Sequence, residues 1–155
     1  MKIRKATNKD AVKISNLKRE TFEKINSKDY AKHFVKSWVK KQSSSHMIEH
    51  IKNDEIFCLT DGEKLIGTVG LYNKEIIGCL YVKYNQIGKG YGRKLMIFIE
   101  NYSKKKGLKV AGLYPTITAI KFYEKLGYKK TKEYTIWEIG DSKFKVYKME
   151  KKLKW

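Results

Sequence analysis

The sequence predicts a single α/β (α+β) domain, residues 1–155, in which helices flank a central mixed, mostly antiparallel sheet of about seven strands. Three observations support this prediction. Strand-like and helix-like patterns alternate along the chain, turn signals separate consecutive strand-like runs, and neither linkers nor repeats divide the sequence. Hydrophobic residues make up 41% of the composition, which is enough to build one buried core.

The first third of the chain predicts one strand and three helices. A strand is expected over residues 2–6, and residues 7–10 resemble a capping box with aspartate in the place of glutamate. Apolar side chains at helical spacing follow over 11–25. Aromatic residues four apart indicate a second helix, and apolar residues after three consecutive serines indicate a third. The second helix contains Tyr30, Phe34 and Trp38, and the third contains Met47, Ile48 and Ile51.

The middle of the chain predicts an antiparallel meander. Its three strand-like runs cover residues 56–60, 65–72 and 75–82. Asp61-Gly62 is a strong hairpin signal between the first two runs, and Asn73-Lys74 separates the second from the third.

The last part of the chain alternates between helices and strands. A glycine-rich turn at 88–92 opens a helix that ends at Gly107, a residue type favoured just after a helix C-terminus. The remaining elements are a strand over 110–114, a helix over 119–126 and two strands over 134–139 and 144–149. The strand–helix–strand unit around 78–114 should form a right-handed crossover between parallel strands.

The charge balance is strongly basic. The chain has 35 Lys and Arg residues against 16 Asp and Glu residues, a formal net charge of +19. Such a surface attracts polyanions, which raises nucleic acid as a partner. Yet only Arg4, Arg19 and Arg93 are arginines, and readers of bases and phosphates favour the planar guanidinium of arginine. The lysine bias therefore favours a compositional origin, and the charge argues against a polycationic substrate.

Several classes of protein are excluded or disfavoured. No apolar run approaches the ~18 residues of a membrane span, and the N-terminus lacks the apolar core of a secretory signal, so a cytoplasmic protein is expected. Cys58 and Cys79 lie in apolar, strand-like segments and are expected to be buried, reduced thiols. His46 and His50 are four residues apart, but Met47 stands where the zinc motif HExxH has glutamate, so no metal site is expected.

The turn Gly88-Lys89-Gly90-Tyr91-Gly92 is the strongest functional signal. It follows a predicted strand and opens a predicted helix, where unpaired backbone N–H groups at the positive end of the helix dipole can bind phosphate. Arg93 stands where a dinucleotide-binding GxGxxG motif has its third glycine, and no GK[ST] of a Walker A loop is present.

These residues resemble the GCN5-related N-acetyltransferase (GNAT) family, whose motif Gln/Arg-x-x-Gly-x-Gly/Ala binds the pyrophosphate of acetyl-CoA. Gly90-x-Gly92 fits this motif, and residues 80–95 resemble the family pattern LYV…GKGxGRxL. Gln86 is displaced by one position, so either the loop has an inserted residue or Ile87 replaces the glutamine. Residues 119–128 resemble a second family segment, A-x-x-F-Y-E-K-x-G-F/Y, with Thr116 in the place of its usual asparagine. The resemblance covers residues 1–150 and is strongest over 63–130.

The resemblance implies a GNAT fold with strands 4 and 5 splayed apart. It also implies that acetyl-CoA is the co-substrate, that its pantetheine arm pairs with strand 4 like an added strand, and that no metal takes part. Pro115 supports the end of strand pairing at this level, because proline has no N–H to donate. The residues expected to bind acetyl-CoA are Cys79, Leu80, Tyr81, Val82, Ile87, Gly88, Lys89, Gly90, Tyr91, Gly92, Arg93, Thr116, Ala119, Phe122 and Tyr123.

Two catalytic residues follow from the resemblance. Tyr123 matches the tyrosine that lies beside the CoA sulfur and is the predicted general acid. Glu75 is the candidate general base, because the family often has a glutamate four residues before the backbone N–H that polarises the thioester. Counting from Glu75 puts this N–H on Cys79, and counting back from Gly90 puts it on Leu80. A one-residue β-bulge would reconcile the two counts.

The acceptor amine is the least determined part. Tyr30 and Phe34, with Trp38, are candidates for lining its pocket, although an aromatic stripe on a helix is also typical of a core. His33, His46 and His50 could assist proton transfer or lie on solvated helix faces.

The sequence therefore predicts an N-acetyltransferase that moves the acetyl group of acetyl-CoA directly to a primary amine of a small molecule or peptide. The alternatives are a catalytically silent CoA-binding module and a nucleic-acid-binding module on the same scaffold. No membrane partner is expected, and homodimers are common in the family.

Overall fold

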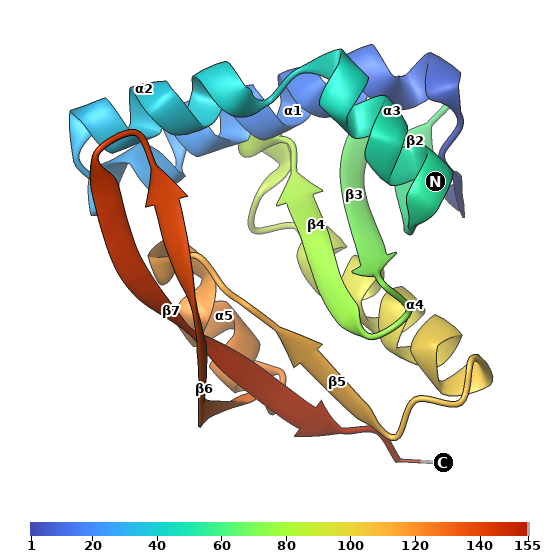
Figure 1. Cartoon of the computed structure of the whole chain (residues 1–155). Coiled ribbons are helices and arrows are strands. Elements are labelled where there is room, and N and C mark those ends of the chain that lie inside the picture. Colours follow the sequence, from blue (N-terminus) through green and yellow to red (C-terminus); the bar gives the residue numbers. More distant parts are fainter. Residues whose placement is uncertain (155) are drawn as a thin grey trace.

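The computed structural model describes residues 1–154 as a seven-stranded sheet with helices on both faces (Figure 1). The strand order is β1-β2-β3-β4-β5-β7-β6, and among these neighbours only β4 and β5 are parallel. The strands are β1 (Lys2–Lys5), β2 (Glu55–Asp61), β3 (Lys64–Tyr72), β4 (Ile76–Val82), β5 (Val110–Leu113), β6 (Lys129–Ile139) and β7 (Ser142–Lys152). The α-helices are α1 (Ala11–Lys24), α2 (Lys32–Lys41), α3 (Ser44–Asn53), α4 (Tyr91–Lys105) and α5 (Ile120–Lys125). The predicted fold class, a mixed and mostly antiparallel sheet flanked by helices, is confirmed.

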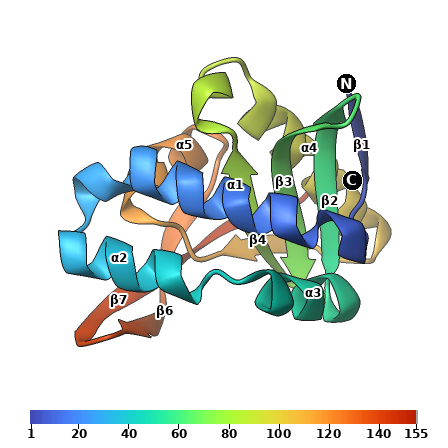
Figure 2. The ribbon, with the colours of Figure 1, turned by 90° about the horizontal axis from the view of Figure 1, so that it is seen from above.

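Alternate residues of β2 enter two different hydrophobic clusters. Phe57 and Leu59 pack in a cluster with residues of α4 and α5, whereas Ile56 and Cys58 pack in one with residues of α1 and α3. This period of two is what a strand between two helical layers requires. Helices α1, α2 and α3 accordingly lie over one face of the sheet, and α4 and α5 lie over the other (Figures 1 and 2).

The predicted capping box fixes the start of the first helix. Asp10 accepts a hydrogen bond of 2.8 Å from the Thr7 N–H and two of 2.8 Å from the Arg4 guanidinium. The hydrogen bonds from Arg4 are the largest cause that lowers the pKa of Asp10, to about 2. The carboxylate is therefore charged at neutral pH and joins β1 to α1.

Strands β4 and β5 pair over a very short length. Ile76 is opposite Gly112 and Ile77 is opposite Leu113, and the parallel ladder ends there. Beyond this point the two strands diverge (Figure 1). The predicted parallel pairing and the splaying of strands 4 and 5 are both confirmed.

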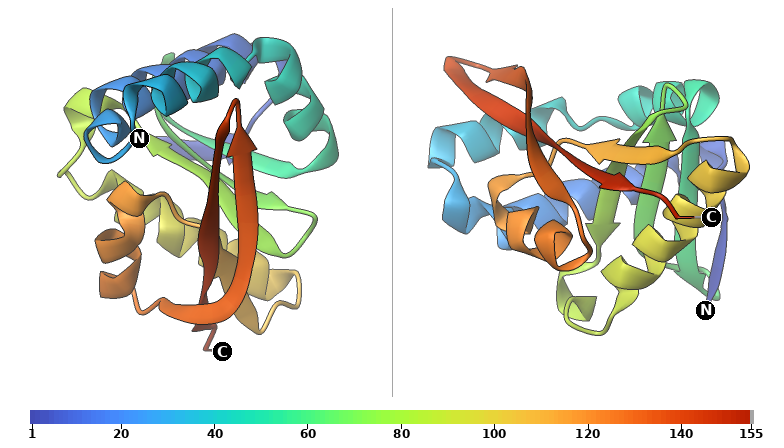
Figure 3. Two further views of the ribbon diagram at one scale, coloured as in Figure 1. Left: turned by 60° about the vertical axis from the view of Figure 1, so that its left-hand side comes forward. Right: turned by 90° about the horizontal axis from the view of Figure 1, so that it is seen from below.

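The C-terminal hairpin is longer than the sequence indicated. β6 and β7 contain 11 residues each, and β7 lies between β5 and β6 (Figure 3). The sequence signal was weak over 129–133, because these residues are mostly charged or polar and exposed, and the β6–β7 register shifts between Lys130 and Tyr134. Near the hairpin tip, Phe144 packs against Phe34 with ring centroids 4.8 Å apart.

The second helix begins later than the aromatic pattern suggested. Residues Asn26–Asp29 form a 3-10 turn, and α2 begins at Lys32, so Tyr30 precedes the helix. Within residues 1–154, none of the helices has both the length and the apolar character needed to cross a membrane.

Candidate active site

A cavity of about 870 Å³ is lined by residues of both β4 and β5, where the two strands diverge. One part, which we call the turn end, is lined by residues of the glycine-rich turn and the start of α4, including Ile87, Gly88, Gly90 and Arg93. The other part, which we call the imidazole end, is lined by Lys18, Trp38, His46, His50 and Tyr72. Helix α3 and the glycine-rich turn, which carry lining residues of the two parts, lie toward opposite ends of β4 (Figure 2).

A β-bulge in β4 shapes the middle of the cavity. Thr68 pairs with Tyr81 and Gly70 pairs with Gly78, so β4 contains one residue more than β3 between these pairs. Cys79 adopts a left-handed conformation with φ of +53°, which is uncommon for a residue with a side chain. The Thr68 hydroxyl donates a hydrogen bond of 2.7 Å to the Cys79 carbonyl and so holds the bulge. The one-residue bulge that reconciles the two sequence counts is therefore present.

Gly78 lets an aromatic ring lie against the strand just before the bulge. A Cβ atom at Gly78 would be 2.4 Å from the ring of Tyr72, closer than any side chain could tolerate. At the other end of β4, the Thr21 hydroxyl of α1 donates a hydrogen bond of 3.1 Å to the Val82 carbonyl. Contacts at both ends thus fix β4 while its β5 side stays open beyond Ile77.

The glycine-rich turn leaves the first turn of α4 accessible from the cavity. Gly88 and Gly90 have φ of +87° and +86°, and Gly90 is the N-cap residue of α4. The Lys94 N–H donates to the Gly90 carbonyl at 3.0 Å. The N–H groups of the helical residues before Lys94 therefore have no acceptor within the helix. The first turn contains no acidic residue, and Arg93 adds a positive charge. This geometry suits an anion such as a phosphate.

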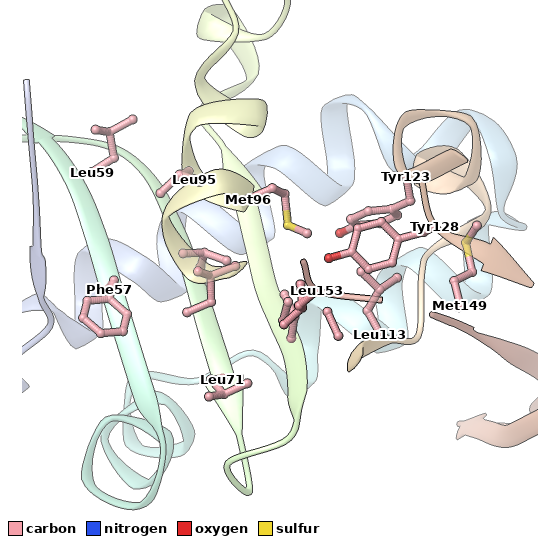
Figure 4. Packing of buried hydrophobic residues seen from close by; sticks show 14 of the residues in the cluster. Phe57, Leu59, Leu71, Leu95, Met96, Leu113, Tyr123, Tyr128, Met149 and Leu153 are labelled. Carbon is pink, nitrogen blue, oxygen red and sulfur yellow. The ribbon is translucent and has the colours of Figure 1, made fainter. Parts of the chain in front are cut away.

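Tyr123 of α5 forms part of the cavity wall. Its side chain is 7% exposed, packs against Phe122 and Tyr128, and lies next to Tyr128 in Figure 4. Burial raises the pKa of the Tyr123 hydroxyl, so this group keeps its proton at neutral pH. It can therefore donate a proton.

Imidazole rings and one lysine dominate the imidazole end. The Nε2 atoms of His46 and His50 are 3.1 Å apart, and the His50 Nδ1 lies 3.0 Å from Asp54 Oδ2. The His50 ring packs against Tyr72 with centroids 4.9 Å apart. The Lys18 Nζ lies 5.9 Å from the centroid of the Trp38 ring and 5.7 Å from that of Tyr81.

The electrostatic character of the cavity is one-sided. Over residues 1–154, the ionisable side chains that line it include Lys18, Arg93, His46 and His50, but no aspartate or glutamate. The cavity is therefore suited to anions at its turn end and unsuited to a polycation anywhere along its length.

The structure brings most of the predicted cofactor residues together. The cavity lining includes all of them except Lys89, whose ammonium donates a hydrogen bond of 3.1 Å to the Gln86 side chain. Gln86 and Ile87 both line the cavity, so the displaced glutamine still lies at the turn end. The Thr116 hydroxyl accepts a hydrogen bond of 3.3 Å from Asn26, which joins the end of α1 to the segment after β5.

The predicted base and the two predicted acceptor-binding residues do not line this cavity. Glu75 lies exposed in the turn before β4, and its role as base stays a prediction. Tyr30 accepts a hydrogen bond of 2.9 Å from the Ile117 N–H, and burial raises the pKa of its hydroxyl. Phe34 is 2% exposed in an aromatic cluster with Phe22 and Trp38. Tyr30 and Phe34 therefore hold the wall around the cavity together, and their predicted role in acceptor binding stays a prediction.

Sequence reasoning missed Lys18 and treated the histidines as open alternatives. The spacing of His46, His50 and Asp54, four residues apart at each step, is a signal that could have connected them, because such residues are neighbours on a helix. Lys18 had no such signal among the chain's many lysines. Its significance comes from burial, which depends on the packing of α1 over β4.

Fold and cavity together are those of an acyltransferase: an open sheet whose single parallel pair separates beside a glycine-rich helix start. A family profile described as "Acetyltransferase (GNAT) domain" matches residues 15–153. The chain therefore belongs to the GNAT family of acetyltransferases.

Solved structures of other proteins have the same fold. A GCN5-related N-acetyltransferase from Rhodopseudomonas palustris superposes with a TM-score of 0.90 at 18% identity, covering 98% of this chain and 95% of that one. PaiA N-acetyltransferase from Thermoplasma acidophilum, solved in complex with coenzyme A, gives 0.79 at 23% identity, covering 97% and 98%. YncA from Salmonella typhimurium, solved with its cofactor acetyl-CoA, gives 0.71 at 14% identity, covering 100% and 95%.

No curated protein matches the chain. Within residues 1–154, no group of three or more His, Cys, Asp or Glu side chains is arranged to hold a metal ion.

Proposed function

We propose that this protein is an N-acetyltransferase that moves the acetyl group of acetyl-CoA directly to a primary amine of a small molecule or peptide. One observation carries the proposal: a single cavity is lined by the glycine-rich turn, the open side of β4 and the hydroxyl-bearing ring of Tyr123. A phosphate-binding group, a backbone edge and a proton donor are three of the features that acetyl transfer from a thioester cofactor uses.

The residues at the turn end fit the phosphates of acetyl-CoA. Backbone N–H groups at the start of α4 would bind the pyrophosphate, and because residues 88 and 90 are glycines, no side chain stands between the ligand and the backbone there. Arg93 would add a charged contact. The open side of β4, from the bulge to Val82, would pair with the amide groups of the pantetheine arm.

The chemistry needs one bond made, one bond broken and two proton movements. Acetyl-CoA supplies an acetyl thioester, whose carbonyl carbon forms a bond to the amine nitrogen while its bond to sulfur breaks. A backbone N–H at the bulge, on Cys79 or Leu80, would polarise the carbonyl oxygen. Tyr123 would donate its proton to the departing sulfur, and the amine nitrogen would lose a proton to a base.

Replacing Gly90 with glutamate should abolish tight binding of coenzyme A. A glutamate here would add strain at φ of +86° and place a negative charge where the pyrophosphate would bind. Isothermal titration with coenzyme A should show at least a tenfold weaker affinity, roughly 1.4 kcal/mol or more. Gly107→Glu is the matched control, because Gly107 has φ of +94° beyond the other end of α4 and does not line the cavity. Wild-type protein without affinity for coenzyme A, or equal affinity in Gly90→Glu, would contradict the proposal.

Replacing Tyr123 with phenylalanine should lower kcat without changing the affinity for coenzyme A. Loss of a general acid costs about a hundredfold or more in rate. The measurement is release of free thiol from acetyl-CoA with a panel of primary amines. Tyr128→Phe is the control, because Tyr128 is also buried but its hydroxyl donates to Glu100 and does not line the cavity. An unchanged kcat in Tyr123→Phe would remove the acid role, and no turnover of any amine despite coenzyme A binding would favour the silent CoA-binding module.

A further inference from the structure

Most of the Lys18 side chain is buried, but its ammonium stays accessible from the cavity and has no anionic partner. The residue is 9% exposed and lines the imidazole end of the cavity. Within residues 1–154, no carboxylate oxygen lies within 4.0 Å of its Nζ, and no protein atom accepts a hydrogen bond from it. The Nζ lies over the faces of the Trp38 and Tyr81 rings.

The ammonium of Lys18 is available to a ligand in the cavity. Within residues 1–154, its three N–H bonds have no protein acceptor, and the faces of two aromatic rings satisfy them only in part. Because no aspartate or glutamate of these residues lines the cavity, an anion that enters would meet no repelling carboxylate beside Lys18.

We propose that Lys18 binds a carboxylate of the acceptor, so that the acetylated amine belongs to an amino acid or a short peptide with a free carboxylate. The proposal rests on the proposed acetyl transfer. One lysine matches one negative charge. Trp38, Tyr72, Tyr81 and Trp137 also line the cavity and suit an acceptor with an apolar body between its two charged groups. A polyamine would instead place a second ammonium beside Lys18 without a carboxylate to offset it.

Product-like ligands test this site without any chemical turnover. N-acetylphenylalanine and N-acetylleucine are titrated against their C-terminal amides, which have the same shape but no charge, in the presence of saturating coenzyme A. The wild-type protein should bind each acid at least tenfold more tightly than its amide. Lys18→Met should remove this difference, and Lys18→Arg should retain part of it. Lys13→Met is the matched control, because Lys13 is exposed on the same helix and does not line the cavity, and it should keep the difference.

Equal binding of acid and amide by the wild-type protein, or no binding of either, would overturn the carboxylate site. So would a difference that persists in Lys18→Met. Coenzyme A binding, measured on the same samples, separates this result from failure of the proposed function. A protein that binds coenzyme A but does not distinguish acid from amide retains its cofactor site and lacks the carboxylate site.

A second observation, the chain Asp54–His50–His46, identifies a base independently. Asp54 can only accept, so the His50 Nδ1 carries the proton of the 3.0 Å hydrogen bond between them. In the state in which His50 is neutral, its Nε2 accepts, so the His46 Nε2 is the donor of the 3.1 Å contact. In this tautomer the His46 Nδ1 is the ring nitrogen with a free lone pair.

The geometry points to His46 as the general base that takes the proton from the acceptor amine, with His50 and Asp54 as positioning residues. His46 lines the same cavity as Cys79 and Tyr123. The ring of Tyr72 packs against both His50 and Gly78 and so connects His50 to β4. The amine proton would move to the His46 Nδ1 as the bond between nitrogen and the acetyl carbon forms. This assignment also rests on the proposed acetyl transfer.

The surroundings of His46 favour its unprotonated form. The residue as a whole is exposed, but partial burial of its ring is the largest cause that lowers the pKa of His46. Repulsion from His50 on α3, in the state in which that ring is protonated, and from Lys18 on α1 lowers it further. Glu49 on α3 acts in the opposite direction. Tyr72 and Asp54 contact His50 and not His46. The base form of His46 therefore persists to a lower pH than in an ordinary histidine.

A pH profile distinguishes a catalytic role of His46 from a structural one. In the wild-type protein kcat/KM should fall as the pH drops through the lowered pKa of His46, because protonation removes the base. His46→Gln should lower kcat/KM about a hundredfold and abolish this acidic limb. Lys18→Met should move the limb to higher pH, because it removes a positive charge that disfavours protonation. Asp54→Asn should shift the limb and lower kcat/KM by less than His46→Gln does.

Controls separate the base from folding and from the cofactor site. His33→Gln changes an exposed histidine that contacts Ser142 and does not line the cavity, and it should leave the profile unchanged. The affinity for coenzyme A should be the same in all these variants. An acidic limb that persists in His46→Gln at wild-type kcat/KM would overturn the assignment, whereas loss of coenzyme A binding in the wild-type protein would overturn the proposed function.

Discussion

Strands β4 and β5 pair through only two residues each before they diverge, and the rest of the site depends on this separation. A continuous ladder would fill the space between the strands with hydrogen bonds and packed side chains. The bulge at Cys79 and the contacts of Gly78 with Tyr72 and of Thr21 with Val82 instead hold β4 against β3 and α1. The backbone of β4 is thus rigid although one of its sides is open, and a rigid open strand is a suitable partner for an extended ligand. Residues from both helical layers line the cavity that results.

The two ends of the cavity explain the basic composition only in part. The turn end uses backbone N–H groups and Arg93 to provide a positive potential, and the imidazole end adds Lys18. These few groups account for little of the net charge of +19. Most lysines lie exposed, and within residues 1–154 Lys18 is the only one that lines the cavity, so the compositional origin of the charge stays a prediction. The informative feature is the absence of acidic side chains from the cavity lining within residues 1–154, which limits the acceptors that the proposed enzyme could use.

Sequence patterns predicted the parts of the molecule whose conformation depends on a few consecutive residues. The glycine turn, the start of α4 and the segment with Tyr123 are each determined by a few consecutive residues, so sequence spacing was sufficient to find them. The bulge could be inferred because two counts along one strand disagreed by one residue. In contrast, Tyr30 resembled a helical residue but lies before α2, where it accepts a hydrogen bond from Ile117, 87 positions away. The burial of Lys18 and its isolation from carboxylates depend equally on tertiary packing, which no local pattern encodes.

Hydrogen exchange with and without coenzyme A tests the central claim most directly, namely that the open side of β4 receives the cofactor. If the cofactor pairs with β4, backbone amides in residues 79–82 and in the turn 88–93 should exchange more slowly in its presence. Amides of β2, which already pairs with β1 and β3, should be unaffected and serve as the internal reference. Slower exchange confined to other segments, with residues 79–82 unchanged at saturating coenzyme A, would contradict this account.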